Sequence, residues 1–163
     1  MVATRTLVAT QSNKKPPSQV KVLVPKVRIL VADDFSAWRV AARKIVEMCP
    51  KWKVIAEAGD GLEAVQKATK LRPDVVLLDV GMPVLNGIEA AKRIKQISPS
   101  SKIIFLTQDI DVEVRVAAFA TGAEAYVLKA RAVCDLQPAV KAALRNGSQP
   151  HALNSRPFAH ISR

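Results

Sequence analysis

The sequence contains little cysteine, and no segment of it is apolar for long. Cysteine occurs only twice in 163 residues, so a disulfide framework is not expected, and the spacing of Cys49 and Cys134 fits no metal or redox motif. We expect both to be reduced and mostly structural. The N-terminus lacks the apolar core of a signal peptide, and no stretch approaches the roughly 20 apolar residues of a membrane helix. A cytoplasmic protein without a membrane segment is therefore the default expectation.

Aromatic residues are also scarce, at 4% of the chain, whereas apolar residues make up 49%. A core must therefore be built from Val, Ile, Leu and Ala, which suits α/β packing. The length fits one domain with tails. We expect a basic, flexible N-terminal extension over residues 1–26, a folded domain over 27–146, and a flexible polar tail over 147–163.

The net charge of +11 is not concentrated in one place. Residues 1–26 carry five basic and no acidic residues, and residues 147–163 carry two basic ones. Such dispersed charges attract polyanions or acidic partners weakly and specify none. No helix-turn-helix pattern follows the folded region, so the sequence contains no visible element for direct, sequence-specific DNA binding.

A strand-then-helix pattern occurs five times between residues 27 and 146. We expect strands to begin near residues 27, 53, 74, 102 and 125. The run Val75 to Leu78 is apolar throughout and is typical of a strand buried on both faces. We expect Ser36 to cap the first helix, and residues 20–24 to form at most a short edge segment. The predicted fold class is α/β, a doubly wound five-stranded parallel sheet.

Polar residues stand where these strands end. Because the carboxyl ends of parallel strands share one edge, the fold should gather Asp33, Asp34, Asp79, Thr107 and Lys129 there. Three carboxylates and one amine leave a charge that a divalent cation would neutralise, and oxygen ligands favour Mg²⁺. An aspartate nucleophile with nearby amine and hydroxyl groups also suits phosphoryl transfer onto Asp79.

These residues resemble the motifs of receiver domains of two-component response regulators. The matching segments, in family order, are Ala32-Asp33-Asp34, Leu78-Asp79 with Met82-Pro83 and Asn86-Gly87, Leu106-Thr107, and Tyr126-Val127-Leu128-Lys129. The resemblance implies the flavodoxin-like receiver fold with strand order 2-1-3-4-5. It also implies a self-phosphorylating and self-dephosphorylating switch, and not a turnover enzyme.

The resemblance further implies a role for each matching residue. Asp79 would accept a phosphoryl group from a histidine kinase, a phosphotransfer protein or a small phosphodonor. Asp34, Asp79 and the Gly81 carbonyl would bind Mg²⁺, and Asp33 would act through water. Thr107 and Lys129 would contact the phosphate. Thr107 and Tyr126 match the family's switch pair, which alters the surface formed by the fourth helix, fifth strand and fifth helix for a downstream protein.

Two positions depart from the family pattern. Ala130 follows Lys129 where a proline is usual, so a trans bond is expected there. Gln108 follows Thr107 where a small residue is more common, and it could cover the site and control access. These departures favour a second interpretation, a receiver-like interaction module that works without phosphorylation.

The sequence does not decide between a complete receiver and a fragment of a larger regulator. Residues 135–145 resemble the last receiver helix of LuxR-type regulators, so the chain could be the receiver fragment of a DNA-binding regulator or a stand-alone receiver. A phosphatase is disfavoured, because Gly81 occupies the position where such an enzyme needs a second acid. Homodimerisation through the fourth and fifth helices is a hypothesis based on the mixed charges of that face.

Overall fold

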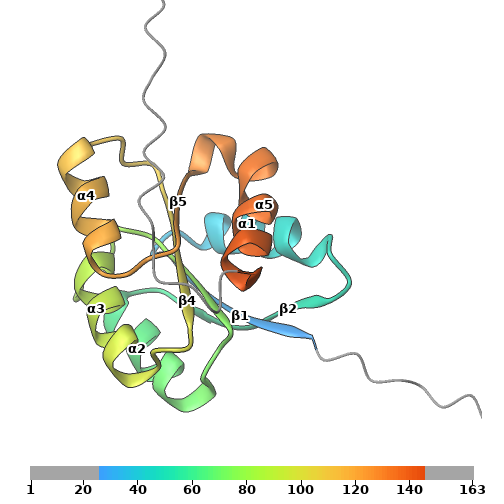
Figure 1. The fold of residues 1–163 in the computed structure, drawn as a ribbon, viewed down its shortest axis with the longest axis horizontal. Helices are drawn as coiled ribbons and strands as arrows, with labels where there is room; N and C mark the ends of the chain where they lie inside the picture. The colour runs from blue at the N-terminus through green and yellow to red at the C-terminus, as the bar shows by residue number, and fades with distance from the viewer. Residues whose placement is uncertain (1–25, 146–163) are drawn as a thin grey trace, which may run out of the picture.

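The computed structural model describes residues 26–145 of the chain. In these residues, five strands alternate with five α-helices (Figure 1). The elements are β1 (Val27–Ala32), α1 (Ser36–Glu47), β2 (Trp52–Ala58), α2 (Gly61–Leu71), β3 (Val75–Leu78), α3 (Gly87–Ile97), β4 (Lys102–Thr107), α4 (Val112–Ala120), β5 (Ala125–Leu128), the 3-10 turn η1 (Lys129–Arg131) and α5 (Ala132–Arg145). The possible edge segment at residues 20–24 and the expected tail lie outside the described residues.

The strands form one parallel sheet with the order β2-β1-β3-β4-β5. The predicted fold class and strand order are therefore confirmed, and each strand begins within one residue of its expected start. All four residues of β3 are at most 1% exposed. Burying each of these side chains contributes about 1.5–3 kcal/mol, which explains why an uninterrupted apolar run occupies the central strand.

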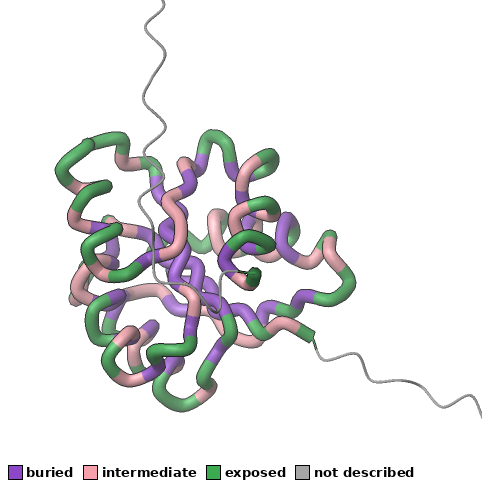
Figure 2. Tube along the Cα trace, viewed as in Figure 1, coloured by how far each residue is buried: buried purple, intermediate pink, exposed green. Residues whose placement is uncertain are grey.

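Alternate side chains along the strands supply two cores, one on each face of the sheet. In β1, Ile29 and Val31 pack with α1 and α5, whereas Leu30 and Ala32 pack with α2, α3 and α4. The helices accordingly lie in two layers, and the buried residues concentrate between them (Figures 1 and 2). With both faces covered, function is confined to the sheet edges and the outer helix faces.

The start of α1 differs from the sequence prediction. Phe35, and not Ser36, is the N-cap residue, and Ser36 is already the first helical residue. The Asp33 side chain accepts the Phe35 N–H at 2.9 Å, so the chain turns one residue earlier than expected. The prediction of Ser36 as the cap was therefore wrong. The Asp33 carboxylate accepts a backbone N–H of the loop, and the helix begins with Ser36 as its first residue.

The two cysteines differ in their surroundings. Both are free, and Cys49 packs partly buried against the core, but Cys134 is exposed. Cys134 lies on the outer side of α5, whose buried side carries Leu136 and Val140. The expectation of a structural role was thus wrong for Cys134.

Two further observations concern the backbone and the helices. Residues 26–145 contain no cis peptide bond, so the bond before Ala130 is trans, as expected. Among the same residues, no helix has both the length and the apolar content needed to span a membrane.

Candidate functional site

The register of the sheet brings the predicted site residues together at its carboxyl edge. Pairing of β1 with β3 places the residues that follow these strands, Asp33 and Asp79, side by side. Pairing of β4 with β5 places Thr107 next to the residue before Lys129. Asp33, Asp79, Thr107 and Lys129 are all at most 6% exposed. These four side chains therefore lie together at one edge of the sheet, as the sequence predicted.

The Lys129 ammonium lies between two carboxylates. Its Nζ atom is 2.7 Å from Asp33 Oδ2 and 3.1 Å from Asp79 Oδ2, and it lies over the Trp38 ring, 5.5 Å from the ring centroid. Burial raises the pKa of Asp33 above its ordinary value, and the hydrogen bond from Lys129 works in the opposite direction. One cation thus serves two buried anions.

The acidic residues form a set that fits a divalent cation. Each of Asp33, Asp34 and Asp79 offers a carboxylate oxygen, and these oxygens lie within 4.8 Å of one another. Three carboxylates and Lys129 sum to two negative charges, which one divalent cation would balance. Oxygen-only ligands suit Mg²⁺ or Ca²⁺ more than the softer metals. The residues present therefore fit the cation that the sequence predicted.

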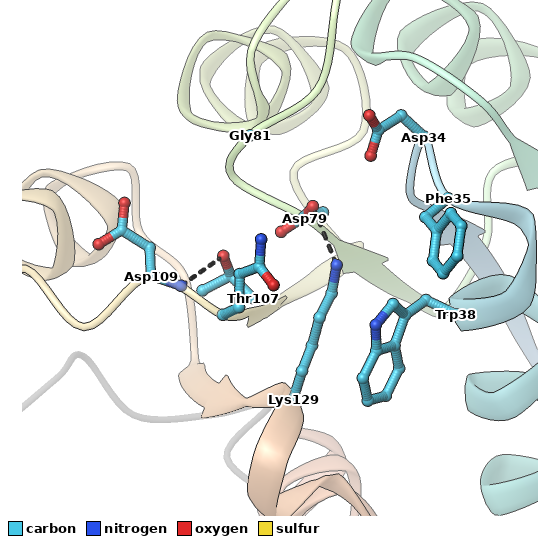
Figure 3. A pocket seen from close by; sticks show the side chains of 9 residues that line it. Asp34, Phe35, Trp38, Asp79, Gly81, Thr107, Asp109 and Lys129 are labelled. Carbon is cyan, nitrogen blue, oxygen red and sulfur yellow. Dashed lines mark hydrogen bonds and ion pairs between the residues drawn. The ribbon is translucent and has the colours of Figure 1, made fainter.

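A cavity of about 470 Å³ opens beside the Asp34 and Asp79 side chains (Figure 3). Asp34, Asp79, Gly81, Thr107 and Lys129 line it. Phe35, Trp38, Gln108 and Asp109 complete the lining. Gln108 is exposed and lies at the cavity, and its expected control of access stays a prediction.

Glycine at two positions allows the backbone to close around Asp79. A Cβ atom on Gly87 would lie 1.9 Å from the Asp79 carbonyl oxygen, and one on Gly61 would lie 2.0 Å from the Leu85 carbonyl oxygen. The Gly87 N–H donates to the Val80 carbonyl at 2.9 Å. The loop after β3 is therefore packed directly against the starts of α2 and α3, which fixes the position of Asp79.

The same loop contains a strained residue. Val84 has a φ of +64°, and the Leu85 N–H donates to the Pro83 carbonyl at 2.7 Å. This bond closes a γ-turn centred on Val84, of the type with positive φ, which is rare and strained. A β-branched side chain makes that conformation costlier. Val84 is 78% exposed, so packing of its side chain does not explain the strain.

Thr107 and Tyr126 meet at the backbone of one residue. The Asp109 N–H donates to Thr107 Oγ1 at 3.2 Å, and the Tyr126 hydroxyl donates to the Asp109 carbonyl at 3.1 Å. Burial raises the pKa of Tyr126, with a further contribution from the Asp109 charge. Tyr126 does not line the main cavity; it lines a second one, of about 200 Å³, with Ile110 and Arg115.

Sequence reasoning missed two residues beside the site, Trp38 and Arg39. Trp38 lines the cavity, and Arg39 donates to the Asp33 carbonyl at 2.7 Å. Their positions, four and five residues after Asp34, make them the third and fourth residues of α1, in its first turn. The spacing from Asp34 was the only feature of the sequence that could have indicated that these residues lie near the site. Packing of α1 on the sheet decides which face of the helix turns toward the acidic loop.

Comparison with known proteins agrees with this geometry. The family model described as "Response regulator receiver domain" matches residues 29–141. The transcriptional regulatory protein DegU of Brevibacillus brevis is 34% identical over 126 residues, which cover 77% of this chain and 53% of that protein. LiaR of Bacillus subtilis is 38% identical over 117 residues, 72% of this chain and 56% of that protein. The chain thus spans about half the length of these regulators.

Solved structures show the same fold. The crystal structure of the response regulator domain of Thermotoga maritima CheB has a TM-score of 0.70 and 31% sequence identity to this chain. The match covers 77% of this chain and 99% of that domain. The family match, the five-stranded order and the acidic pocket all agree, and the chain belongs to the response regulator receiver domain family.

Proposed function

We propose that the chain is a phosphorylation-dependent switch in which Asp79 accepts a phosphoryl group. The observation that carries this proposal is the position of the Asp79 carboxylate, buried beside Lys129, Asp33 and Thr107 at the base of an open cavity. A buried carboxylate that faces a cavity can be reached by a phosphodonor while its surroundings hold it in one orientation. The proposed folded unit is residues 27–146.

The chain's own residues supply the groups that this transfer needs. An Asp79 oxygen attacks phosphorus, the new O–P bond forms, and the donor bond to imidazole nitrogen or acyl oxygen breaks with its electron pair leaving on the donor. Lys129, freed from part of its pairing with Asp79, donates to the phosphoryl oxygens. Thr107 already accepts a hydrogen bond from Asp109, so its own proton is available to donate to the phosphate.

Asp34, Asp79 and the Gly81 carbonyl would hold Mg²⁺, with Asp33 acting through water. When bound, the cation would neutralise charge on the phosphoryl oxygens. Support comes from the proximity of the three carboxylates and from Gly81, which lines the cavity with Asp34 and Asp79.

Asp109 offers a route from the site to the surface. If Thr107 turns toward a phosphoryl oxygen, its contact with the Asp109 N–H is lost, and the carbonyl of the same residue holds the Tyr126 hydroxyl. Tyr126 would then be free to change position between Phe105 and Phe119, whose ring centroids lie 6.1 and 6.4 Å from its own. Thr107 and Tyr126 are thus proposed as the switch pair.

The proposed output is a contact with a downstream protein through α4, β5 and α5. Exposed apolar side chains on and before α4 support this: Ile110 is 79% exposed, Val112 72% and Val116 64%. Exposed apolar groups gathered on one helix are typical of interaction sites. Dimerisation through this face is part of the same proposal. The phosphoryl donor is proposed to be a histidine kinase, a phosphotransfer protein or a small phosphodonor. The proposed location is the cytoplasm.

The test is intact-protein mass after incubation with acetyl phosphate, with and without Mg²⁺. One phosphoryl adduct that requires Mg²⁺ is expected for the wild type and should be absent from Asp79→Asn. The matched control is Asp74→Asn: Asp74 immediately precedes β3, at the opposite end of that strand from Asp79, and it accepts the Arg28 N–H at 2.7 Å. This variant should keep the adduct. A folded wild type with no adduct would instead favour a module that works without phosphorylation.

A second candidate is that the chain is the receiver part of a DNA-binding transcriptional regulator. The similarity to DegU and LiaR favours it, because the chain covers about half the length of each of these regulators. The native polypeptide's mass in its source cells tests this. A mass near 17.7 kDa would contradict it, and a mass roughly twice as large would support it.

A further inference from the structure

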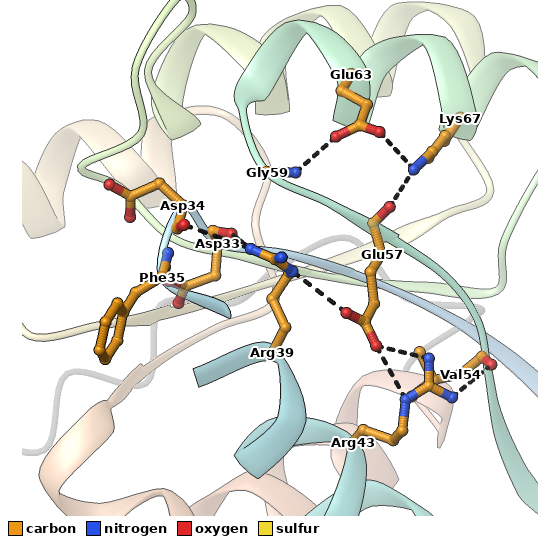
Figure 4. A network of polar contacts seen from close by, with 10 residues as sticks. All are labelled: Asp33, Asp34, Phe35, Arg39, Arg43, Val54, Glu57, Gly59, Glu63 and Lys67. Carbon is orange, nitrogen blue, oxygen red and sulfur yellow. Dashed lines mark hydrogen bonds and ion pairs between the residues drawn. The ribbon is translucent and has the colours of Figure 1, made fainter. Parts of the chain in front are cut away.

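Arg39 connects α1 to the acidic loop between β1 and α1 (Figure 4). Its Nη1 atom donates to the Asp33 carbonyl at 2.7 Å and lies 3.4 Å from the Asp34 carbonyl. The guanidinium therefore contacts the backbone of both adjacent acidic residues. Its planar, multiply donating shape suits such contacts with neighbouring acceptors.

The opposite side of the Arg39 guanidinium is anchored to β2. Its Nε atom donates to Glu57 Oε2 at 3.2 Å. The other Glu57 oxygen accepts from Arg43 Nη2 at 2.7 Å and from Arg43 Nε at 3.0 Å. These arginines hold the pKa of Glu57 below its ordinary value, Arg43 having the larger effect. Glu57 therefore stays ionised and gives Arg39 a fixed partner.

The acidic loop needs such support because its charges repel one another. Asp33, Asp34 and Asp79 place three carboxylates within one small region. Lys129 pairs with Asp33 and Asp79, whereas within residues 26–145 the Asp34 carboxylate has no hydrogen bond or ion pair and is exposed. The placement of Asp34 thus depends on its backbone, and Arg39 lies against the carbonyl groups of that backbone.

We propose that Arg39 is a positioning residue for divalent-cation binding, acting through the backbone of Asp33 and Asp34. This inference rests on the proposed function, because the cation is the one that Asp34 and Asp79 would bind. Arg39 holds the loop in the conformation that directs the Asp34 carboxylate into the cavity. Residues that orient metal ligands typically change metal affinity by about 10- to 100-fold when they are replaced.

Arg43 provides a matched control. It lies on the same helix and bonds the same Glu57 carboxylate, but its other partners are Glu47 and the Val54 carbonyl, away from the acidic loop. A general loss of stability on replacing an α1 arginine would affect Arg39 and Arg43 variants alike. A positioning role predicts an effect on cation affinity for Arg39 only.

The experiment is a Mg²⁺ titration of the full chain, followed by the fluorescence of Trp38, which lines the cavity. The other tryptophan, Trp52, is replaced in all samples (Trp52→Phe), and calorimetry gives a second measure of affinity. Arg39→Gln should weaken Mg²⁺ binding by at least about tenfold, and Arg43→Gln by less than about threefold. Thermal melts establish that each variant is folded.

Arg39→Lys keeps the inference testable if Arg39→Gln does not fold. A lysine amine keeps the charge but cannot bridge Glu57 and the loop as a guanidinium does, so a loss of about three- to tenfold is expected. Unchanged affinity in the folded Arg39 variants, or equal losses for Arg39→Gln and Arg43→Gln, would overturn the positioning role. A wild type that binds no Mg²⁺ would instead contradict the cation site of the proposed function.

Discussion

Lys129 Nζ donates to Asp79 Oδ2 at 3.1 Å, although the two residues are 50 positions apart. Their side chains are 5% and 8% exposed, so water screens this ion pair little. The same ammonium lies 2.7 Å from Asp33. Two buried carboxylates therefore depend on one cation, and the effect of removing that cation can be measured.

Lys129→Met should destabilise the protein by about 3 kcal/mol, because it leaves two buried carboxylates without their partner. Urea unfolding without Mg²⁺ would measure this. Adding Asp33→Asn removes one of the two repelling charges, so the double variant should recover at least about 1 kcal/mol. Strict additivity of the two substitutions would contradict the coupling.

Gly87→Ala should destabilise the protein by about 3 kcal/mol, because its Cβ atom would lie 1.9 Å from the Asp79 carbonyl oxygen and the backbone must move. The displacement of Asp79 should also slow acetyl phosphate labelling. Gly59→Ala is the control, since its nearest contact is at 3.8 Å. Denaturant melts that rank both variants alike would argue against the close approach.

Val84→Gly should stabilise the protein by about 1 kcal/mol, since glycine adopts a positive φ without strain and this outweighs its greater freedom in the unfolded chain. Val116→Gly, at an exposed helical position on α4, should instead destabilise it by about 0.4 kcal/mol, the difference in helix propensity between valine and glycine. Unfolding free energies of the two variants test this. If both variants lose stability equally, Val84 is not strained.

Glu57 should make stability depend on acid pH. Its folded-state pKa lies below the ordinary 4.5, so its ionised form contributes stability above pH 4.5 that is lost as the pH falls through the lowered folded value. Glu57→Gln should reduce stability at pH 6 and flatten the decline between about pH 5 and pH 3. Unfolding free energies across this range test it, with Glu113→Gln, an exposed position, as the control.

Gln108→Ala should speed both labelling of Asp79 by acetyl phosphate and loss of the label, each by at least about twofold, because it opens the cavity to donor and water. Time courses of intact mass measure both rates. Slower labelling would mean that the Gln108 amide assists the donor rather than covering the site.

The sequence by itself determined the element order and the chemistry of the site. The apolar run at Val75 to Leu78 requires burial on both faces, and turn residues end each segment. A parallel sheet then brings residues that follow different strands to one edge, so Asp33, Asp79 and Lys129 could be predicted to meet.

Tertiary structure alone decided how those residues are held. Sequence patterns do not reveal which side of α1 turns toward the acidic loop, so the contacts of Arg39 and Trp38 were not predicted. The Asp33 side chain accepts the Phe35 N–H, and the observed helix cap therefore differs from the predicted one. The near contact of Gly87 with Asp79 and the strain at Val84 likewise depend on distances between segments, which packing fixes and local preference does not.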